Sequence, residues 1–123
     1  MSTYACLFLP FPVSANNLFV NNPRTRGRFP SKRYIEWQTE AMRVLDKQRP
    51  LPFFGVPVAV TLSFGRPDKR KRDLANLEKA PVDLMVKADV ILDDFLIERL
   101  TLKWVPDVTG CRVEIEKMSV VEW

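Results

Sequence analysis

The chain has 123 residues, which is enough for one domain with a modest core and too few for two. Its composition, with 46% hydrophobic and 28% charged residues, is typical of a globular protein and excludes wholesale disorder. The net charge of +4 is mild, so the distribution of the charge matters more than its total.

The sequence contains no histidine. This absence excludes Ser-His-Asp and Cys-His nucleophile systems and histidine-ligated zinc hydrolases. Cys6 and Cys111 are too few for a zinc site, and we expect two reduced, packed thiols in a cytoplasmic protein. No apolar run is long enough to span a bilayer, and the first residues lack the features of a signal peptide, so no membrane association is expected.

The first half of the chain predicts a strand, a long loop and a helix. Residues 3–9 are apolar on both faces, which favours an interior strand ended by Pro10 and Pro12. Residues 13–33 show little periodicity and are interpreted as a long ordered loop with a short strand around residues 18–20. Ser31 is the expected N-cap of a helix that continues to about Lys47. Its predicted apolar face consists of Tyr34, Ile35, Gln38, Ala41, Met42 and Leu45.

The second half predicts a strand, a second helix and two further strands. Residues 56–64 alternate with strict period two, and a helix over 77–88 follows, with Asn76 as its N-cap. Pro81 should kink this helix or weaken its first turn. Alternation around residues 99–104 and 113–116, joined by "PDVTG", predicts a hairpin. The expected order is β-loop-α-β-α-β-β, a single compact α+β domain over 1–123 with a mixed β-sheet and two main helices.

Carboxylates stand beside strongly basic segments. Asp73 follows a strand, and Asp93 and Asp94 precede the next one, so N-cap and turn roles are the plain interpretation. A helix over 77–88 can hold the loops at its two ends apart, so spacing alone does not place Asp94 beside Asp73. The neighbouring cations fit a phosphate-binding surface and are Lys69, Arg70, Lys71 and Arg72 in one group and Arg24, Arg26, Arg28, Lys32 and Arg33 in another. Carboxylates within such a surface repel phosphate unless they hold a divalent cation.

Two segments carry a family resemblance. "LPFPVSANNLF" is similar to the "LPxPPSxN" opening of the RusA family of Holliday junction resolvases. "RPDKRKRDLANLEKAPVDLM…ADVILDDFLIERL" resembles that family's basic run, its "DxDNLxKAxxDAL" motif and its later paired aspartates. The resemblance covers about residues 9–103, and the second motif is the more specific.

The resemblance implies a homodimeric endonuclease that nicks four-way DNA junctions symmetrically with Mg2+, for which Mn2+ can substitute. It implies catalytic roles for Asp73, Asp94 and Lys79, and metal binding by Asp73, Asp94 and Asp93. It assigns DNA binding to Asn17 and Asn76 and to the basic run 69–72; the basic loop supplies Arg24, Arg26, Arg28 and Lys32 as further candidates.

Ala75 departs from the family pattern, because it occupies the position of the second metal-site aspartate. Losing one carboxylate should weaken metal binding while leaving the basic surface intact, so we expect impaired cleavage. An engineered inactivating change is favoured over a natural loss, and replacement ligands among Asp68, Glu78 and Asp83 are the other interpretation.

Two other functions remain open from sequence. One is a non-catalytic protein that binds junctions or other nucleic acid on the same fold. The other is a small basic RNA-binding domain, which ranks low because the stacking strands of such domains are missing. Phe19 and Phe29 are candidates for wedging into an opened junction, whereas Trp37, Trp104 and Trp123 are expected to pack in a core or an interface.

Overall fold

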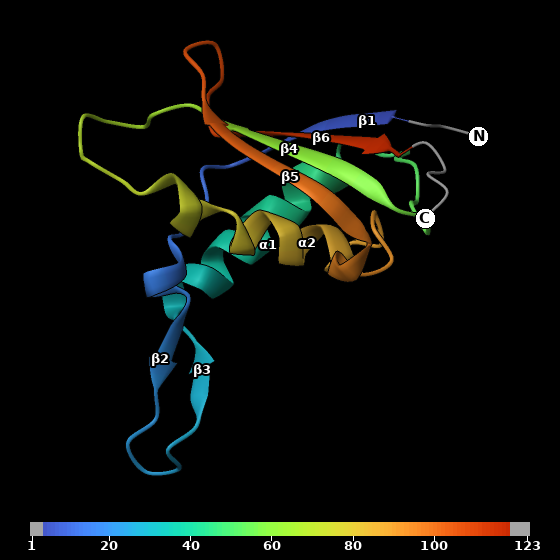
Figure 1. Ribbon diagram of the computed structural model, residues 1–123. Coiled ribbons are helices and arrows are strands. Elements are labelled where there is room, and N and C mark those ends of the chain that lie inside the picture. The colour runs from blue at the N-terminus through green and yellow to red at the C-terminus, as the bar shows by residue number, and fades with distance from the viewer. Residues whose placement is uncertain (1–3, 119–123) are drawn as a thin grey trace.

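The protein is described here by a computed structural model that covers residues 4–118, so Trp123 lies outside the described residues. A mixed four-stranded sheet packs on two helices, and a small separate hairpin projects from the body (Figure 1). The predicted α+β class with a mixed sheet and two helices is confirmed. None of the helices in the described part is long and apolar enough to cross a membrane. The elements are β1 Tyr4–Leu9, η1 Ala15–Asn17, β2 Phe19–Asn21, β3 Arg28–Pro30, α1 Lys32–Asp46, β4 Val58–Phe64, η2 Leu74–Leu77, α2 Lys79–Lys87, η3 Asp94–Leu96, β5 Ile97–Trp104 and β6 Cys111–Lys117.

The sheet order is β1-β6-β4-β5. β4 runs parallel to β5 and antiparallel to β6, and β1 runs antiparallel to β6. The predicted β5–β6 hairpin is therefore wrong, because β4 lies between the two strands. Sequence reasoning detected the turn residues between β5 and β6 but not that β4 lies between these two strands in the sheet.

The connection from β5 to β6 crosses the end of β4. The backbone N–H of Val105 donates to Phe64 O at 2.9 Å, and that of Gly65 donates to Gly110 O at 3.0 Å. A Cβ on Gly65 would lie 1.6 Å from the carbonyl oxygen of Val108. Only glycine lets the crossing loop approach β4 this closely.

The helix α1 agrees with the prediction. The Ser31 hydroxyl accepts a hydrogen bond from the Tyr34 N–H at 3.1 Å, and Lys47 is the C-cap. Trp37 is buried, as expected for a packing residue, and its indole N–H donates to Pro10 O at 3.2 Å. Ile35, predicted to be buried, is 51% exposed, because the buried stripe runs through Trp37 instead.

The helix α2 begins later than predicted. Asn76 lies inside the 3-10 turn η2, and Glu78 precedes α2, so Asn76 is not the N-cap. Pro81 is the third residue of α2, and the first helical bond is donated by Val82 to Glu78 O at 3.1 Å. The missing N–H of Pro81 therefore costs no intrahelical bond.

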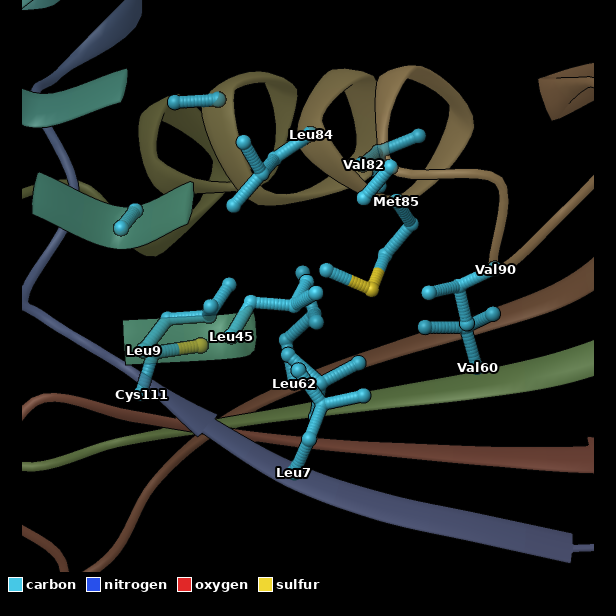
Figure 2. Packing of buried hydrophobic residues seen from close by; sticks show 14 of the residues in the cluster. Leu7, Leu9, Leu45, Val60, Leu62, Val82, Leu84, Met85, Val90 and Cys111 are labelled. Carbon is cyan, nitrogen blue, oxygen red and sulfur yellow. The ribbon is translucent and has the colours of Figure 1, made fainter. Parts of the chain in front are cut away.

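The core lies between the sheet and the two helices, which cover one face of it (Figure 1). Figure 2 shows side chains of the strands and of the helices pointing toward one another. Those from the sheet include Leu7, Leu9, Val60 and Leu62, and those from the helices include Leu45, Leu84 and Met85. Each such side chain contributes about 1.5–3 kcal/mol on burial. β4 is buried on both faces, which fits its central position.

β1 is an edge strand, so the prediction of an interior strand is wrong. Its burial alternates, and Tyr4, Cys6 and Phe8 are exposed. Cys6 and Cys111 are both free thiols, but only Cys111 is packed in the core. The side-chain amide of Gln48 covers this edge: it accepts from the Phe8 N–H at 2.8 Å and donates to Phe8 O at 2.7 Å. The amide thus occupies the place of a neighbouring peptide group.

The predicted long loop contains a two-stranded hairpin, β2–β3, which extends away from the sheet and helices (Figure 1). Its turn is held by Asn22, whose side-chain oxygen accepts from the Arg24 N–H at 2.9 Å. At its base, the Phe19 ring meets Tyr34 edge-on at 5.8 Å, and Arg28 lies over the Phe19 ring at 5.1 Å. Phe19 is therefore a packed residue of the hairpin base, whereas Phe29 is 46% exposed.

Candidate active site and nucleic-acid interface

A pocket of about 340 Å³ lies where the segment before β2 meets the segment before α2. The 3-10 turns η1 and η2 pack against each other at this point. The pocket thus joins the two sequence segments that were singled out independently. It is lined by Phe11, Pro12, Ser14, Asn16, Asn17, Arg33, Arg70, Lys71, Arg72, Asp73, Asn76 and Leu77.

Arg72 is held rigidly within this pocket. Its two terminal nitrogens lie 2.6 and 2.9 Å from the two carboxylate oxygens of Asp68, and its guanidinium lies over the Phe11 ring at 5.3 Å. The Arg72 side chain is only 20% exposed. Hydrogen bonds from Arg72 and from the Arg70 backbone hold the pKa of Asp68 well below its usual range.

The remaining cations of the pocket are freer. Within residues 4–118, Arg33 and Lys71 make no ion pair, and Arg70 reaches Asp68 at 3.2 Å with a side chain that is 77% exposed. Four cations thus face one lining carboxylate, that of Asp73. Such an excess of positive charge favours a polyanion.

The carboxylate of Asp73 does not cap the turn that follows it. Asp73 precedes η2 in extended conformation, but its side chain makes no cap hydrogen bond. The side chain is exposed on the wall of the pocket. The plain interpretation of Asp73 as a side-chain N-cap is therefore wrong.

Asp93 and Asp94 form a pair before β5. The Asp93 carboxylate caps η3 by accepting from the Phe95 N–H at 3.3 Å, so the structure gives Asp93 the turn role that sequence suggested. A hydrogen bond between the two carboxyls lowers the pKa of Asp93 and raises the pKa of Asp94. The pair therefore holds a proton more readily than two isolated aspartates.

Lys79 and Asp83 form an ion pair on α2, with 3.2 Å between the Lys79 Nζ and a carboxylate oxygen. The hydrogen bond to Asp83 raises the pKa of Lys79. Burial raises the pKa of neighbouring Glu78, and the charges of Asp83 and Asp94 add to this effect. Among the three suggested replacement ligands, Asp68 and Asp83 are thus paired with cations, whereas Glu78 has no ion pair within the described chain.

The two groups of aspartates leave the sheet from opposite ends. β4 and β5 are parallel, with Val58 beside Ile97 and Phe64 beside Trp104. Along the chain, Asp73 directly precedes η2, Asp94 begins η3, and η2 and α2 lie between them. Residues 4–118 hold no group of three His, Cys, Asp or Glu side chains that could bind a metal ion. The carboxylates of one chain therefore do not fit a ready-made Mg2+ or Mn2+ site, and the metal-site assignment stays a prediction.

Ala75 lies exposed within η2, two residues beyond Asp73 and next to Asn76. Nothing in its surroundings requires a small side chain, so an aspartate would fit there without repacking the core.

Most of the predicted DNA-binding residues divide between two places. Arg70, Lys71, Arg72, Asn17 and Asn76 line the pocket, whereas Arg24, Arg26 and Arg28 lie on the hairpin arm. Lys69 and Lys32 lie exposed just outside these two groups. Phe11, Ser14 and Asn16 lie within the opening motif that carried the family resemblance, and Asn16 was also counted with the basic surface. The sequence did not show that these residues face residues 70–77.

Comparison with known proteins shows similarity over nearly the whole chain. The family described as Endodeoxyribonuclease RusA matches residues 10–116. A protein of Escherichia coli strain K12 named "Crossover junction endodeoxyribonuclease RusA" is 31% identical over 116 residues, which cover 94% of this chain and 93% of that protein. Proteins of the same name from Shigella sonnei and from Enterobacteria phage 82 are similar at the same identity and coverage.

Proposed function

Because the chain belongs to the RusA family of endodeoxyribonucleases, we propose that it is a Holliday junction resolvase in fold and DNA recognition. The observation that carries this proposal is the pocket, in which the two family-like segments converge on Asp73 amid four cations. The cations without an ion pair in the described part of the chain, Arg33 and Lys71, hold the phosphate backbone, and the arginines of the hairpin arm extend the same surface.

We propose that cleavage by this chain is impaired. Asp73, Asp94 and Lys79 are assigned the catalytic roles, with Asp93 beside them at the metal site, and Mg2+ or Mn2+ is the expected cofactor. The support for impairment is Ala75 together with the lack of a three-ligand group within residues 4–118. A site with fewer carboxylates holds a divalent ion less well, because Mg2+ needs several oxygen ligands in near-octahedral geometry.

The test is to add the missing carboxylate. Wild type and Ala75→Asp are each incubated with a synthetic four-way junction and with a linear duplex of the same sequence, with and without Mg2+. We expect both proteins to bind the junction more tightly than the duplex, and only Ala75→Asp to release nicked products. Ala75→Asp combined with Asp73→Asn should bind and not cut, which is the control for a contaminating nuclease.

Two outcomes would overturn parts of the proposal. If neither protein prefers the junction to the duplex, the assigned substrate is wrong. If Ala75→Asp binds but never cuts, the metal-site assignment fails, and the second candidate is favoured: a non-catalytic junction-binding protein on the same fold. The observation that keeps this candidate open is that residues 4–118 hold no group of three potential ligand side chains that could bind a metal ion.

A homodimer and a cytoplasmic location complete the proposal. Two active centres related by a two-fold axis suit a substrate with two-fold symmetry, and each cuts one of two equivalent strands. Light scattering coupled to gel filtration measures this directly, and a monomer at the concentration of the binding assay would contradict it.

A further inference from the structure

We propose that the pocket beside Asp73 holds a single nucleotide swung out of the base stack, with its base stacked on the guanidinium of Arg72. This inference rests on the proposed function, since it assigns the pocket a part in reading the branch point. The ligand is one deoxynucleotide of the junction, recognised by its base as well as its phosphate.

Arg72 is suited to stacking rather than to binding phosphate. Two of its five N–H donors are already directed at the Asp68 carboxylate, so that carboxylate offsets the charge of the guanidinium and competes with a phosphate for it. The Phe11 ring lies against the guanidinium and fixes its plane. A guanidinium fixed in this way is a flat platform, and nucleobases stack on arginine planes as they do on aromatic rings.

The pocket has the size and lining for one nucleotide. Its volume of about 340 Å³ falls within the range of small-molecule sites. Among its apolar lining residues, Phe11 is half-buried and Pro12 and Leu77 are buried, and the amides of Asn16, Asn17 and Asn76 supply donors and acceptors. None of these three amides makes a side-chain hydrogen bond to another part of the described chain, so they are available for the edge of a base.

The phosphate of the same nucleotide has its own partners. Arg33 and Lys71 line the pocket and make no ion pair within residues 4–118. The pocket thus contains two kinds of cation: Arg72, whose charge is paired with Asp68, and Arg33 and Lys71, which have no ion pair within residues 4–118. This division predicts that base recognition and phosphate binding respond to different substitutions.

A pocket of this kind selects branched DNA. Extruding a base from a duplex costs the free energy of its pairing and stacking, and that cost is smallest where the bases are already unpaired. In an opened junction, the base pairs at the strand-exchange point have a stacking neighbour on only one side, whereas those within a linear duplex stack on both sides, so extrusion costs less at the branch point.

The experiment compares Arg72→Lys with wild type. The ligands are the four deoxynucleoside 5′-monophosphates, inorganic phosphate and the four-way junction. Lysine keeps the charge but has no plane, so we expect nucleotide and junction binding to weaken by about 5- to 150-fold, the range for one stacked base. Phosphate affinity and the salt dependence of junction binding should stay the same, because the number of cations is unchanged.

Two further variants keep the test decisive. Arg43→Lys makes the same change in an arginine clamped by Glu40 on α1, outside the pocket, and should leave all three affinities unchanged. Asn16→Ala with Asn17→Ala alters two exposed side chains, so it should fold normally and reduce the differences in affinity among the four monophosphates.

Three results would overturn the inference. In the first, the nucleoside monophosphates bind no more tightly than inorganic phosphate. In the second, Arg72→Lys reduces the affinity for phosphate as much as the affinity for nucleotide. In the third, Arg72→Lys leaves the affinity for the junction unchanged. Failure of the proposed function has a different signature, namely equal binding of junction and duplex by the wild type, and the monophosphate measurements do not depend on it.

Discussion

Gly65→Ala tests the topology of the sheet directly. The new Cβ would lie 1.6 Å from the Val108 carbonyl oxygen and 2.6 Å from its carbonyl carbon, and both are backbone atoms. Relief requires the crossing loop to lift, which disrupts the hydrogen bonds donated by Gly65 and Val105. Overpacking costs about 1–3 kcal/mol and each of the two lost hydrogen bonds about 0.5–1.5 kcal/mol, so we expect a loss of about 2–6 kcal/mol.

The assay is urea unfolding followed by circular dichroism, together with thermal melting. For a chain of this length the expected loss corresponds to a fall in Tm of about 6–30 °C. Gly55→Ala is the matched control, because its Cβ would meet only the Phe53 ring at 3.4 Å. The control should stay within about 1 kcal/mol of wild type.

A small effect of Gly65→Ala would refute the crossing. If the variant unfolds within about 1 kcal/mol of wild type, Val108 cannot pass over β4 at this distance. A direct β5–β6 hairpin, as the turn residues alone suggest, would then be the better topology.

Three further predictions concern the edge, the core and pH. Gln48→Ala removes both hydrogen bonds to Phe8 and should lower the free energy of unfolding in urea by about 1–3 kcal/mol. Aggregation measured by light scattering should increase. An unchanged free energy of unfolding would show that the amide does not protect β1. Leu62→Ala should cost about 2–5 kcal/mol in the same assay, because this fully buried side chain lies at the centre of the core, and a loss below 1 kcal/mol would contradict that position. Burial raises the pKa of Cys111 from 9.0 to about 12, so above pH 9 the unfolded chain loses this proton before the folded one does. Stability should therefore fall between pH 9 and pH 12, and Cys111→Ala should remove that part of the fall; an unchanged pH profile in the variant would rule Cys111 out as its source.

Local signals in the sequence predicted local structure well. The start of α1 could be predicted from Ser31, because a capping side chain and the N–H that it binds are only three residues apart in the sequence. The four strands of the main sheet were also found, since their alternation is a property of consecutive residues, whereas the three-residue strand β3 was not. Their neighbours were not found: nothing in residues 97–117 shows that β4 lies between β5 and β6.

The site shows the same division. Asp73 and the basic run were identified from the sequence, and the family resemblance supplied their interpretation. The contact of Asp68 with Arg72 was hidden, because a run of charges does not show which pairs form. Phe19 looked like a free aromatic residue on a basic loop, but Tyr34 and Arg28 enclose it.

The pairing of β1 with β6 also determines when the protein becomes able to act during its synthesis. Tyr4 pairs with Glu116 and Leu9 with Cys111, so the first strand finds its partner only after synthesis has passed residue 116. The Phe11 ring, which stacks on Trp104 and supports Arg72, is equally dependent on late residues. A nascent chain held on the ribosome carries both basic segments but lacks the support that aligns them. On the proposed function, we expect such a chain to contact DNA as a flexible polycation, and we expect discrimination between DNA shapes only once β6 has paired with β1.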